Sequence, residues 1–277
     1  MTIRLLLAAA AVAVAALVPP AHTAQAEAVT ACGETHLRDS FISTELQQKA
    51  QIEILLAAGI TAPNPQKDQF AQIARAVFVC AQTDALIDLV PITDTGFGRG
   101  PLFSATAPGP HNGQTNPLRI KKQKEELEKR AALAIHTVLF TPEQFTGSDI
   151  LGTLWTAGNA LRQSGAPKRV VVIVANGWHQ TRSIDIFTYH KPPDLVAGDV
   201  VKKLRAEHRM PNLTDTDVFV AGISKGANGM RIDEGGLSSL CTFWRKIVTE
   251  SGGVMHDDSC GRMLPGMTEG LATPSPQ

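Results

Sequence analysis

The apolar positions of the chain form two kinds of pattern, unbroken runs and helically spaced repeats. Among the unbroken runs, Val170 to Ala175 is the most strand-like, because all its residues are apolar and most are β-branched. A run without alternation is typical of a strand buried on both faces of a parallel sheet. The segment 102–107 lies between two prolines and predicts an antiparallel strand at a sheet edge. The predicted strands are 27–35, 85–93, 102–107, 168–175 and 217–222.

The helically spaced repeats predict long helices between these strands. Leu46, Ala50, Ile54 and Leu55 recur at helical spacing, which predicts a helix from Ser43 or Thr44 to about residue 58. Asn116-Pro117 is a capping residue followed by proline at the first helical position. The predicted helices are 43–58, 66–82, 116–140, 145–164, 196–208 and 237–251.

Strands that alternate with helices of this length predict an α/β fold, a mostly parallel doubly wound sheet with helices on both faces. In open sheets of this kind, ligands bind outside the carboxyl ends of the strands. We therefore expect the functional residues in the loops after Thr35, Thr93, Ala175 and Gly222, and in the loop at Thr146–Asp149.

The N-terminus has the order of a secretory signal peptide. Arg4 precedes an apolar run from Leu5 to Val18, and Ala24-Gln25-Ala26 offers small residues for cleavage before Glu27. The sequence predicts a signal peptide at 1–26, one domain at 27–264 and a disordered tail at 265–277, in a protein that is secreted or held in the cell envelope.

Two kinds of membrane attachment are alternatives to cleavage. The apolar run has about 14 residues, whereas a spanning helix needs roughly 20, so we expect no transmembrane segment after cleavage. Val29-Thr30-Ala31-Cys32 resembles a bacterial lipobox, which would place a lipid anchor on Cys32. A lipobox normally adjoins the apolar run, and here Pro19, Pro20 and Glu27 intervene.

Composition excludes some classes of function. The chain has 26 basic and 26 acidic residues, so it lacks the basic excess of a nucleic-acid-binding surface. Its four cysteines, Cys32, Cys80, Cys241 and Cys260, have no C-x-x-C spacing. In an exported chain this even count favours disulfides over a metal site. Four cysteines can form two disulfides in three different pairings, and the count alone does not choose among them.

The order of four segments resembles the von Willebrand factor type A family, in particular its divergent bacterial members. The segments are a Thr- or Ser-led helix start, a valine-rich strand, a strand that ends in glycine, and a C-terminal helix. In this chain they read Thr146-Gly147-Ser148-Asp149-Ile150-Leu151-Gly152-Thr153-Leu154, Val170-Val171-Val172-Ile173-Val174-Ala175-Asn176-Gly177, Asp217-Val218-Phe219-Val220-Ala221-Gly222, and the helix with Phe243-Trp244.

The resemblance implies a divalent-metal site of oxygen ligands, but the residues match it poorly. Ser148 stands where the family has Thr, and Asn176 where it has Asp, so a negative ligand is lost. After the first predicted strand, neither Asp39–Ser43 nor the frame ending at Ser40 supplies the required Asp-x-Ser-x-Ser. We therefore expect a degenerate site at Ser148 and Asn176 that does not hold Mg²⁺, and no other cofactor.

The resemblance also implies a disulfide pairing. A first strand at 29–35 beside the helix that carries Cys80 favours Cys32–Cys80, and the last helix with its returning loop favours Cys241–Cys260.

One motif points to an enzyme instead. Gly222-Ile223-Ser224-Lys225-Gly226 matches the G-x-S-x-G elbow of serine hydrolases and follows a predicted strand. The later acid and base that a triad needs are restricted to Asp233, His256, Asp257 and Asp258. The segment after Ser224 is also rich in glycine rather than apolar.

The leading hypothesis is a non-enzymatic module that binds an extracellular or envelope protein. Its predicted surface is the loop set with Ser40, Asp94, Ser148, Asn176 and Ser224. The alternative is an α/β serine hydrolase that uses Ser224 as the nucleophile.

Overall fold

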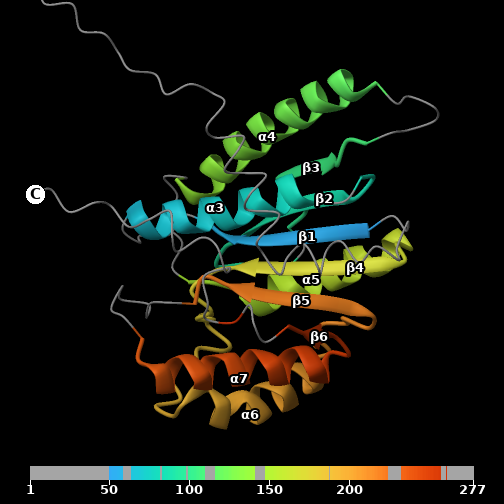
Figure 1. Ribbon diagram of the computed structural model, residues 1–277. Coiled ribbons are helices and arrows are strands. Elements are labelled where there is room, and N and C mark those ends of the chain that lie inside the picture. The colour runs from blue at the N-terminus through green and yellow to red at the C-terminus, as the bar shows by residue number, and fades with distance from the viewer. Residues whose placement is uncertain are drawn as a thin grey trace, which may run out of the picture.

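The computed structural model describes most of the central part of the chain (Figure 1). The described residues are 50–58, 64–81, 83–97, 99–109, 116–140, 147–186, 188–223, 232–256 and 260, without the side chains of 64, 65 and 80. The predicted signal peptide, the Cys32 lipobox, the 27–35 strand, Ser40, Ser224 and the tail from 265 lie outside them. These interpretations, and the domain boundaries at 26 and 264, stay predictions.

The described strands form one six-stranded sheet with the order β3-β2-β1-β4-β5-β6. All neighbours pair in parallel except β2 and β3, which are antiparallel. The bounds are β1 Ala50–Ala57, β2 Leu86–Ile92, β3 Phe103–Thr106, β4 Lys168–Val174, β5 Thr216–Ala221 and β6 Val254–Met255. The α/β class and the antiparallel edge strand near 102–107 are thereby confirmed.

Helices connect the strands and cover the sheet. Their bounds are α3 Asn64–Cys80, α4 Pro117–Leu139, α5 Ile150–Ser164, α6 Pro193–Ala206 and α7 Glu234–Glu250. Helix α3 packs against α4, and α6 against α7. In Figure 1, α3 passes in front of the strands and α5 behind them. No described helix is both long and apolar enough to cross a membrane.

The start of the sheet corrects the sequence prediction. Residues 50–57, expected to be the end of a helix at 43–58, form strand β1 at the centre of the sheet, between β2 and β4. All eight residues are buried. Pairing with a strand on each side and burial on both faces outweigh the local helical spacing of Ala50, Ile54 and Leu55.

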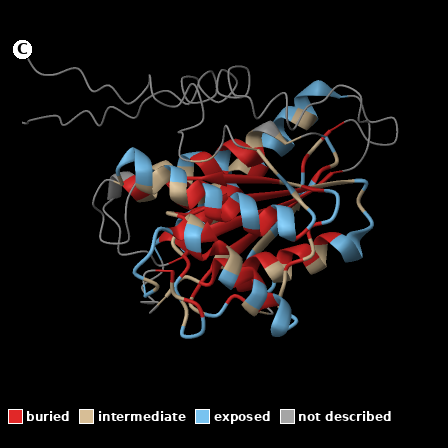
Figure 2. Cartoon of the chain, turned by 90° about the horizontal axis from the view of Figure 1, so that it is seen from below, coloured by how far each residue is buried: buried red, intermediate tan, exposed pale blue. Residues whose placement is uncertain are grey.

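The buried residues form a continuous aliphatic core on both faces of the central strands (Figure 2). Strand β4 is fully buried from Val170 to Val174. This burial explains why 168–174 has no polar alternation, and it agrees with the predicted two-sided strand.

Polar side chains interrupt this core on β1 and β2. Gln51, Glu53 and Asp88 are all buried, and the Gln51 amide donates to Glu53 Oε1 at 3.0 Å and to Asp88 Oδ2 at 3.3 Å. Burial, and then the neighbouring charge of Asp88, raise the pKa of Glu53 to about 8. Glu53 is therefore mostly protonated at neutral pH. The side-chain amide of Gln51 stabilises the two neighbouring carboxyl groups, Glu53 and Asp88, by donating to both.

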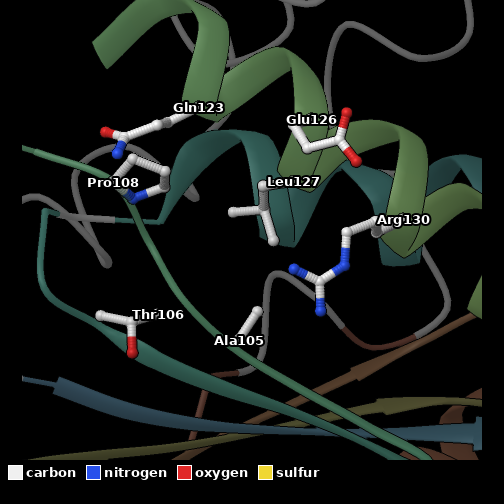
Figure 3. Close-up of a pocket in the computed structure, with 7 residues that line it drawn as sticks. All are labelled: Ala105, Thr106, Pro108, Gln123, Glu126, Leu127 and Arg130. Atoms are coloured by element: carbon white, nitrogen blue, oxygen red, sulfur yellow. The ribbon is translucent and has the colours of Figure 1, made fainter. Parts of the chain in front are cut away.

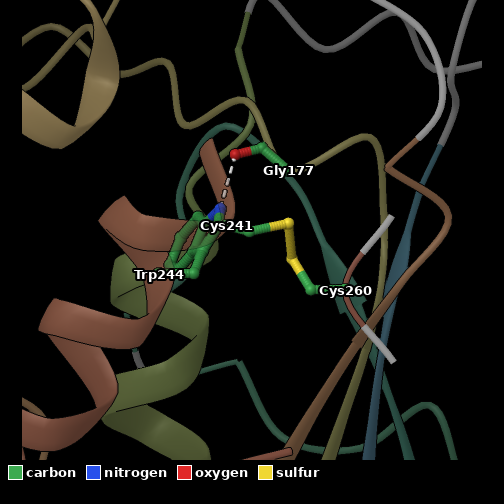
Figure 4. The surroundings of a disulfide bond; sticks show 4 residues. All are labelled: Gly177, Cys241, Trp244 and Cys260. Carbon is green, nitrogen blue, oxygen red and sulfur yellow. Dashed lines mark hydrogen bonds between the residues drawn. A yellow bond between two sulfur atoms is a disulfide. The ribbon is translucent and has the colours of Figure 1, made fainter. Parts of the chain in front are cut away.

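A disulfide ties the chain after β6 to helix α7 (Figure 4). Cys241 and Cys260 are joined, with their Cα atoms 5.9 Å apart, as expected from the resemblance. One turn further along α7, Trp244 Nε1 donates to the carbonyl oxygen of Gly177 at 2.8 Å. Helix α7 is thus fixed to the loop after β4. The other expected pair, Cys32–Cys80, lies outside the described side chains.

Candidate binding site at the carboxyl ends of the strands

The sheet order creates a topological switch between β1 and β4. The chain leaves these two neighbouring parallel strands in opposite directions, to β2 and to β5. In doubly wound sheets a crevice opens at such a point, outside the carboxyl ends of the strands. The described loops at this edge are 93–97 after β2, 175–186 after β4, and 222–223 after β5.

Asp149 joins the loop after β2 to the start of α5. Its Oδ1 accepts from the backbone N–H of Gly152 at 2.8 Å, which caps α5, and its Oδ2 accepts from Gly96 N–H at 2.8 Å. Its own N–H donates to the carbonyl oxygen of Thr93 at 2.6 Å. The side chain is buried, so its negative charge is satisfied by backbone donors rather than exposed to a ligand.

Gly96 is required for this close approach. A Cβ atom at position 96 would lie 2.4 Å from the backbone nitrogen of Thr153 and 2.6 Å from the carbonyl oxygen of Asp149. Only a residue without a side chain lets the loop after β2 rest on the first turn of α5.

His179 lies in the same network and is 1% exposed. Its Nδ1 accepts from Leu151 N–H at 3.4 Å and stands 3.9 Å from Asp149 Oδ1. Burial, and then the positive charge of Arg209, lower the pKa of His179 to about 3. The ring is therefore neutral at physiological pH, with its proton on Nε2, which faces Thr181 Oγ1 at 3.4 Å. The contact with Asp149 is not an ion pair.

Backbone pairing joins the loop after β4 to the start of α5. Ser148 and Gln180 exchange two hydrogen bonds, Ser148 N–H to Gln180 O at 2.8 Å and Gln180 N–H to Ser148 O at 3.0 Å. Gly147 fits closely here, since a Cβ atom would lie 2.3 Å from Gln180 O and 3.9 Å from Asp94 Cβ. Three loops are thus held together as one unit, with Thr95, Gln180, Arg182 and Ser183 exposed along its rim.

Asp94, Ser148 and Asn176 all lie at this edge. Asp94 lies beside Gly147, the residue before Ser148, because a Cβ atom at position 147 would be 3.9 Å from Asp94 Cβ. Asn176 Oδ1 accepts from Trp178 N–H at 3.2 Å, so its side chain shapes the turn after β4. Ser40 and Ser224 lie outside the described residues.

Sequence reasoning missed the role of Asp149 and His179 in organising the edge. Asp149 before an apolar run is a helix-cap signal, and that signal places the start of α5 at Ile150 rather than near 145. Trp178 and His179 lie in the loop directly after β4. His179 is buried and Trp178 is partly buried.

The described donors at this edge do not fit a hard divalent cation. The sequence between β1 and α3, residues 58–63, reads Ala-Gly-Ile-Thr-Ala-Pro and contains no carboxylate. The frames 36–40 and 39–43 precede the first described strand instead of following it, because that strand is β1. Asn176 Oδ1 and both oxygens of Asp149 already accept backbone N–H groups. Among the described residues no three His, Cys, Asp or Glu side chains cluster as metal ligands would.

His256, a candidate base for a hydrolase, lies at the other end of β5. Its N–H donates to Val218 O at 3.0 Å, its ring stacks on Phe219, and its Nε2 is 2.9 Å from Asp217 Oδ1. Burial alone would raise the pKa of Asp217, but hydrogen bonds with Lys168 and His256 lower it. At about 3.3 Å per residue, Asp217 and Ile223 are roughly 20 Å apart. The Asp217–His256 pair thus stabilises the amino end of β5, far from the strand-end loops.

Comparisons with known proteins do not identify a family. No family model matches the chain, and no curated protein matches it. Among solved structures, the fold is similar to a crystal structure described as a conserved hypothetical protein BatB from Bacteroides thetaiotaomicron. That match has a TM-score of 0.31 and 11% identity, and it covers 74% of this chain and 88% of that one. The sheet itself defines the class, a mixed α/β domain that is consistent with a Rossmann-like or von Willebrand A-like fold.

Proposed function

We propose that the chain is a non-enzymatic binding module of von Willebrand A-like fold, secreted or held in the cell envelope. It binds a protein partner through the strand-end loops around Asp94, Ser148 and Asn176. The observation that carries the proposal is the hydrogen-bonded unit of Asp149, Gly96 and the Ser148–Gln180 pair. Loops fixed in advance lose little conformational entropy on binding, which favours recognition.

The same unit supports binding rather than catalysis. A general base must reach a proton of the substrate, but His179 is buried and neutral and Asp149 is occupied by backbone donors. The exposed groups of the described rim are Thr95, Gln180, Arg182 and Ser183, neutral polar or cationic side chains suited to hydrogen bonds with a protein surface.

Site-specific photo-crosslinking tests the proposal. A benzophenone side chain is placed at Thr95, Gln180 or Arg182 of the exported protein, and at Arg162 and Lys202 as controls. The controls are exposed near the carboxyl ends of α5 and α6. In the source organism, we expect the rim positions to give one discrete adduct that the controls do not give. An adduct pattern shared by rim and control positions would contradict the proposal.

The hydrolase alternative has its own test. A fluorophosphonate probe labels an activated serine. Under the binding proposal the exported protein stays unlabelled. Labelling that disappears in Ser224→Ala would replace the binding proposal with the hydrolase.

A further inference from the structure

A groove lies at the β3 edge of the sheet, apart from the strand-end loops (Figure 3). Its volume is about 330 Å³, and it is lined by Ala105, Thr106, Pro108, Gln123, Glu126, Leu127 and Arg130. Strand β3 forms the floor and α4 the roof. A smaller cavity of about 60 Å³ shares Pro108 and Leu127 with it and continues toward the carboxyl end of α3.

Among the described residues, none pairs with the outward backbone groups of strand β3 along this groove. The N–H of Ala107 donates to Ala85 O at 2.8 Å, toward β2. In an antiparallel pair the inward groups alternate, so the N–H and C=O of Ser104 and Thr106 point away from β2. Both residues are exposed, and β3 is the outermost strand. Such an edge pairs with an added strand.

Helix α4, which roofs the groove, is basic overall, and the charged side chains that line the groove itself are Glu126 and Arg130. Helix α4 carries six cations (Arg119, Lys121, Lys122, Lys124, Lys129 and Arg130) and three anions (Glu125, Glu126 and Glu128), a net charge of +3. All six cations are exposed, whereas the whole chain has equal numbers of basic and acidic residues. The charge of the chain is therefore unevenly distributed, with a positive surface beside the open strand edge.

Arg130 connects these two features. Its guanidinium lies 5.3 Å from the centre of the Phe103 ring, and Figure 3 shows it directed from α4 toward β3. No carboxylate in the described part of the chain forms an ion pair with it. A guanidinium held in this way is available to a carboxylate that enters the groove.

We propose that the β3 edge and α4 bind an acidic, extended segment of a partner protein by strand addition. The backbone of the segment pairs with Ser104 and Thr106, and alternate side chains enter the groove between Ala105 and Leu127 or face the cations of α4. A second copy of this chain fits poorly, because pairing two β3 edges would bring two positively charged α4 helices together. A nucleic acid lacks the alternating N–H and C=O groups that the edge requires.

Fluorescence anisotropy with defined probes tests the charge requirement. The probes are capped, labelled peptides of about eight residues, a typical strand length, that alternate valine with glutamate or valine with lysine, and a labelled oligothymidine. We expect the glutamate peptide to bind at least about tenfold more tightly than the lysine peptide, about 1.4 kcal/mol. Arg130→Glu is expected to remove most of this preference. Lys202→Glu, a charge reversal on exposed α6, is expected to keep it.

Hydrogen exchange tests strand addition itself. The glutamate peptide is expected to protect the amides of Ser104 and Thr106 and to leave that of Val254, at the opposite sheet edge, unchanged. Ser104→Pro removes one outward donor without removing a β2–β3 hydrogen bond, so it is expected to weaken binding about tenfold. The proposal would be overturned if neither peptide bound. It would also be overturned if oligothymidine bound as tightly as the glutamate peptide and the amides of Ser104 and Thr106 gained no protection.

Discussion

Asp149 Oδ2 accepts a hydrogen bond from the N–H of Gly96, a residue 53 positions earlier in the chain, at 2.8 Å. This contact joins the loop after β2 to the start of α5 and makes the strand-end edge one unit. The loop after β4 belongs to it through the Ser148–Gln180 pair. A partner that binds at this edge meets loops whose positions are already fixed.

Replacing Asp149 tests the strength of this unit. Asp149→Ala removes a helix cap and leaves the N–H groups of Gly96 and Gly152 without their acceptor. A lost cap costs about 1 kcal/mol and an unsatisfied buried group about 1–3 kcal/mol, so we expect a loss of about 3 kcal/mol in urea unfolding. Asp149→Asn keeps one acceptor oxygen and is expected to lose less. Equal stability of wild type and Asp149→Ala would contradict the role given to this side chain.

The buried His179 predicts sensitivity to acid. Its pKa is about 3 in the folded protein, against about 6.5 when unfolded. The unfolded state therefore binds an extra proton between these values, and stability present above pH 6.5 is lost as the pH falls toward 3. The slope approaches about 1.4 kcal/mol per pH unit. His179→Asn keeps an acceptor for Leu151 N–H and is expected to flatten this slope. Urea unfolding at pH 4 to 7 measures it, with exposed His208→Asn as control.

Glu53 predicts the opposite dependence on pH. Its folded pKa of about 8 lies above the ordinary value of 4.5, so its stabilising contribution is complete below pH 4.5 and is lost as the pH rises through 8. Glu53→Gln keeps the hydrogen-bonding shape and removes the charge. We expect this variant to be more stable than wild type at pH 8 by about 4 kcal/mol, and about equal at pH 4.5. The idea fails if the stability difference between variant and wild type does not change over this range.

The Cys241–Cys260 disulfide closes a loop with a sequence separation of 19. Chain entropy predicts a stabilisation of about 3 kcal/mol for a loop of that size. The double variant Cys241→Ser, Cys260→Ser is expected to lose about this amount in urea unfolding, without loss of the Trp244–Gly177 contact. A change below about 0.5 kcal/mol would show that the bond does not stabilise the fold.

Thermal melting with metal tests the expectation that no divalent cation binds at Ser148 and Asn176. An ion present at 100 times its Kd stabilises a protein by about 2.7 kcal/mol. We expect the same Tm in Mg²⁺, Mn²⁺, Ca²⁺ and chelator. A rise in Tm with millimolar Mg²⁺ that is lost in Asn176→Ala would establish a site there.

The sheet was largely predictable where its strands are mostly apolar. Strands β2, β4 and β5 lie within one or two residues of the predicted runs, because two-sided burial removes polar alternation. Strand β1 was predicted as helix, because Leu46, Ala50, Ile54 and Leu55 recur at helical spacing, and Gln51 and Glu53 interrupt an apolar strand pattern. Those two residues are buried through hydrogen bonds that involve Asp88, 35 or more positions away, which no local pattern reveals. Strand β6, only two residues long, gave no signal.

The candidate site was predictable in position but not in detail. The rule that sites follow parallel strands placed Asp94, Ser148 and Asn176 at one edge, and the structure brings them there. The interlocking of Asp149, Gly96 and His179 depends on contacts between distant segments. A helix-cap signal marks Asp149, but nothing in the sequence around His179 shows that its ring is buried and neutral.

The yield of crosslinked adduct from Gln180 relative to that from Arg162 tests the central claim most directly. Gln180 is exposed on the loop after β4, and Arg162 is exposed at the far end of α5. With benzophenone at each position in the source organism, the strand-end binding account predicts one discrete protein adduct from Gln180 and none from Arg162. Equal adducts from both positions, or an adduct from Arg162 alone, would contradict it.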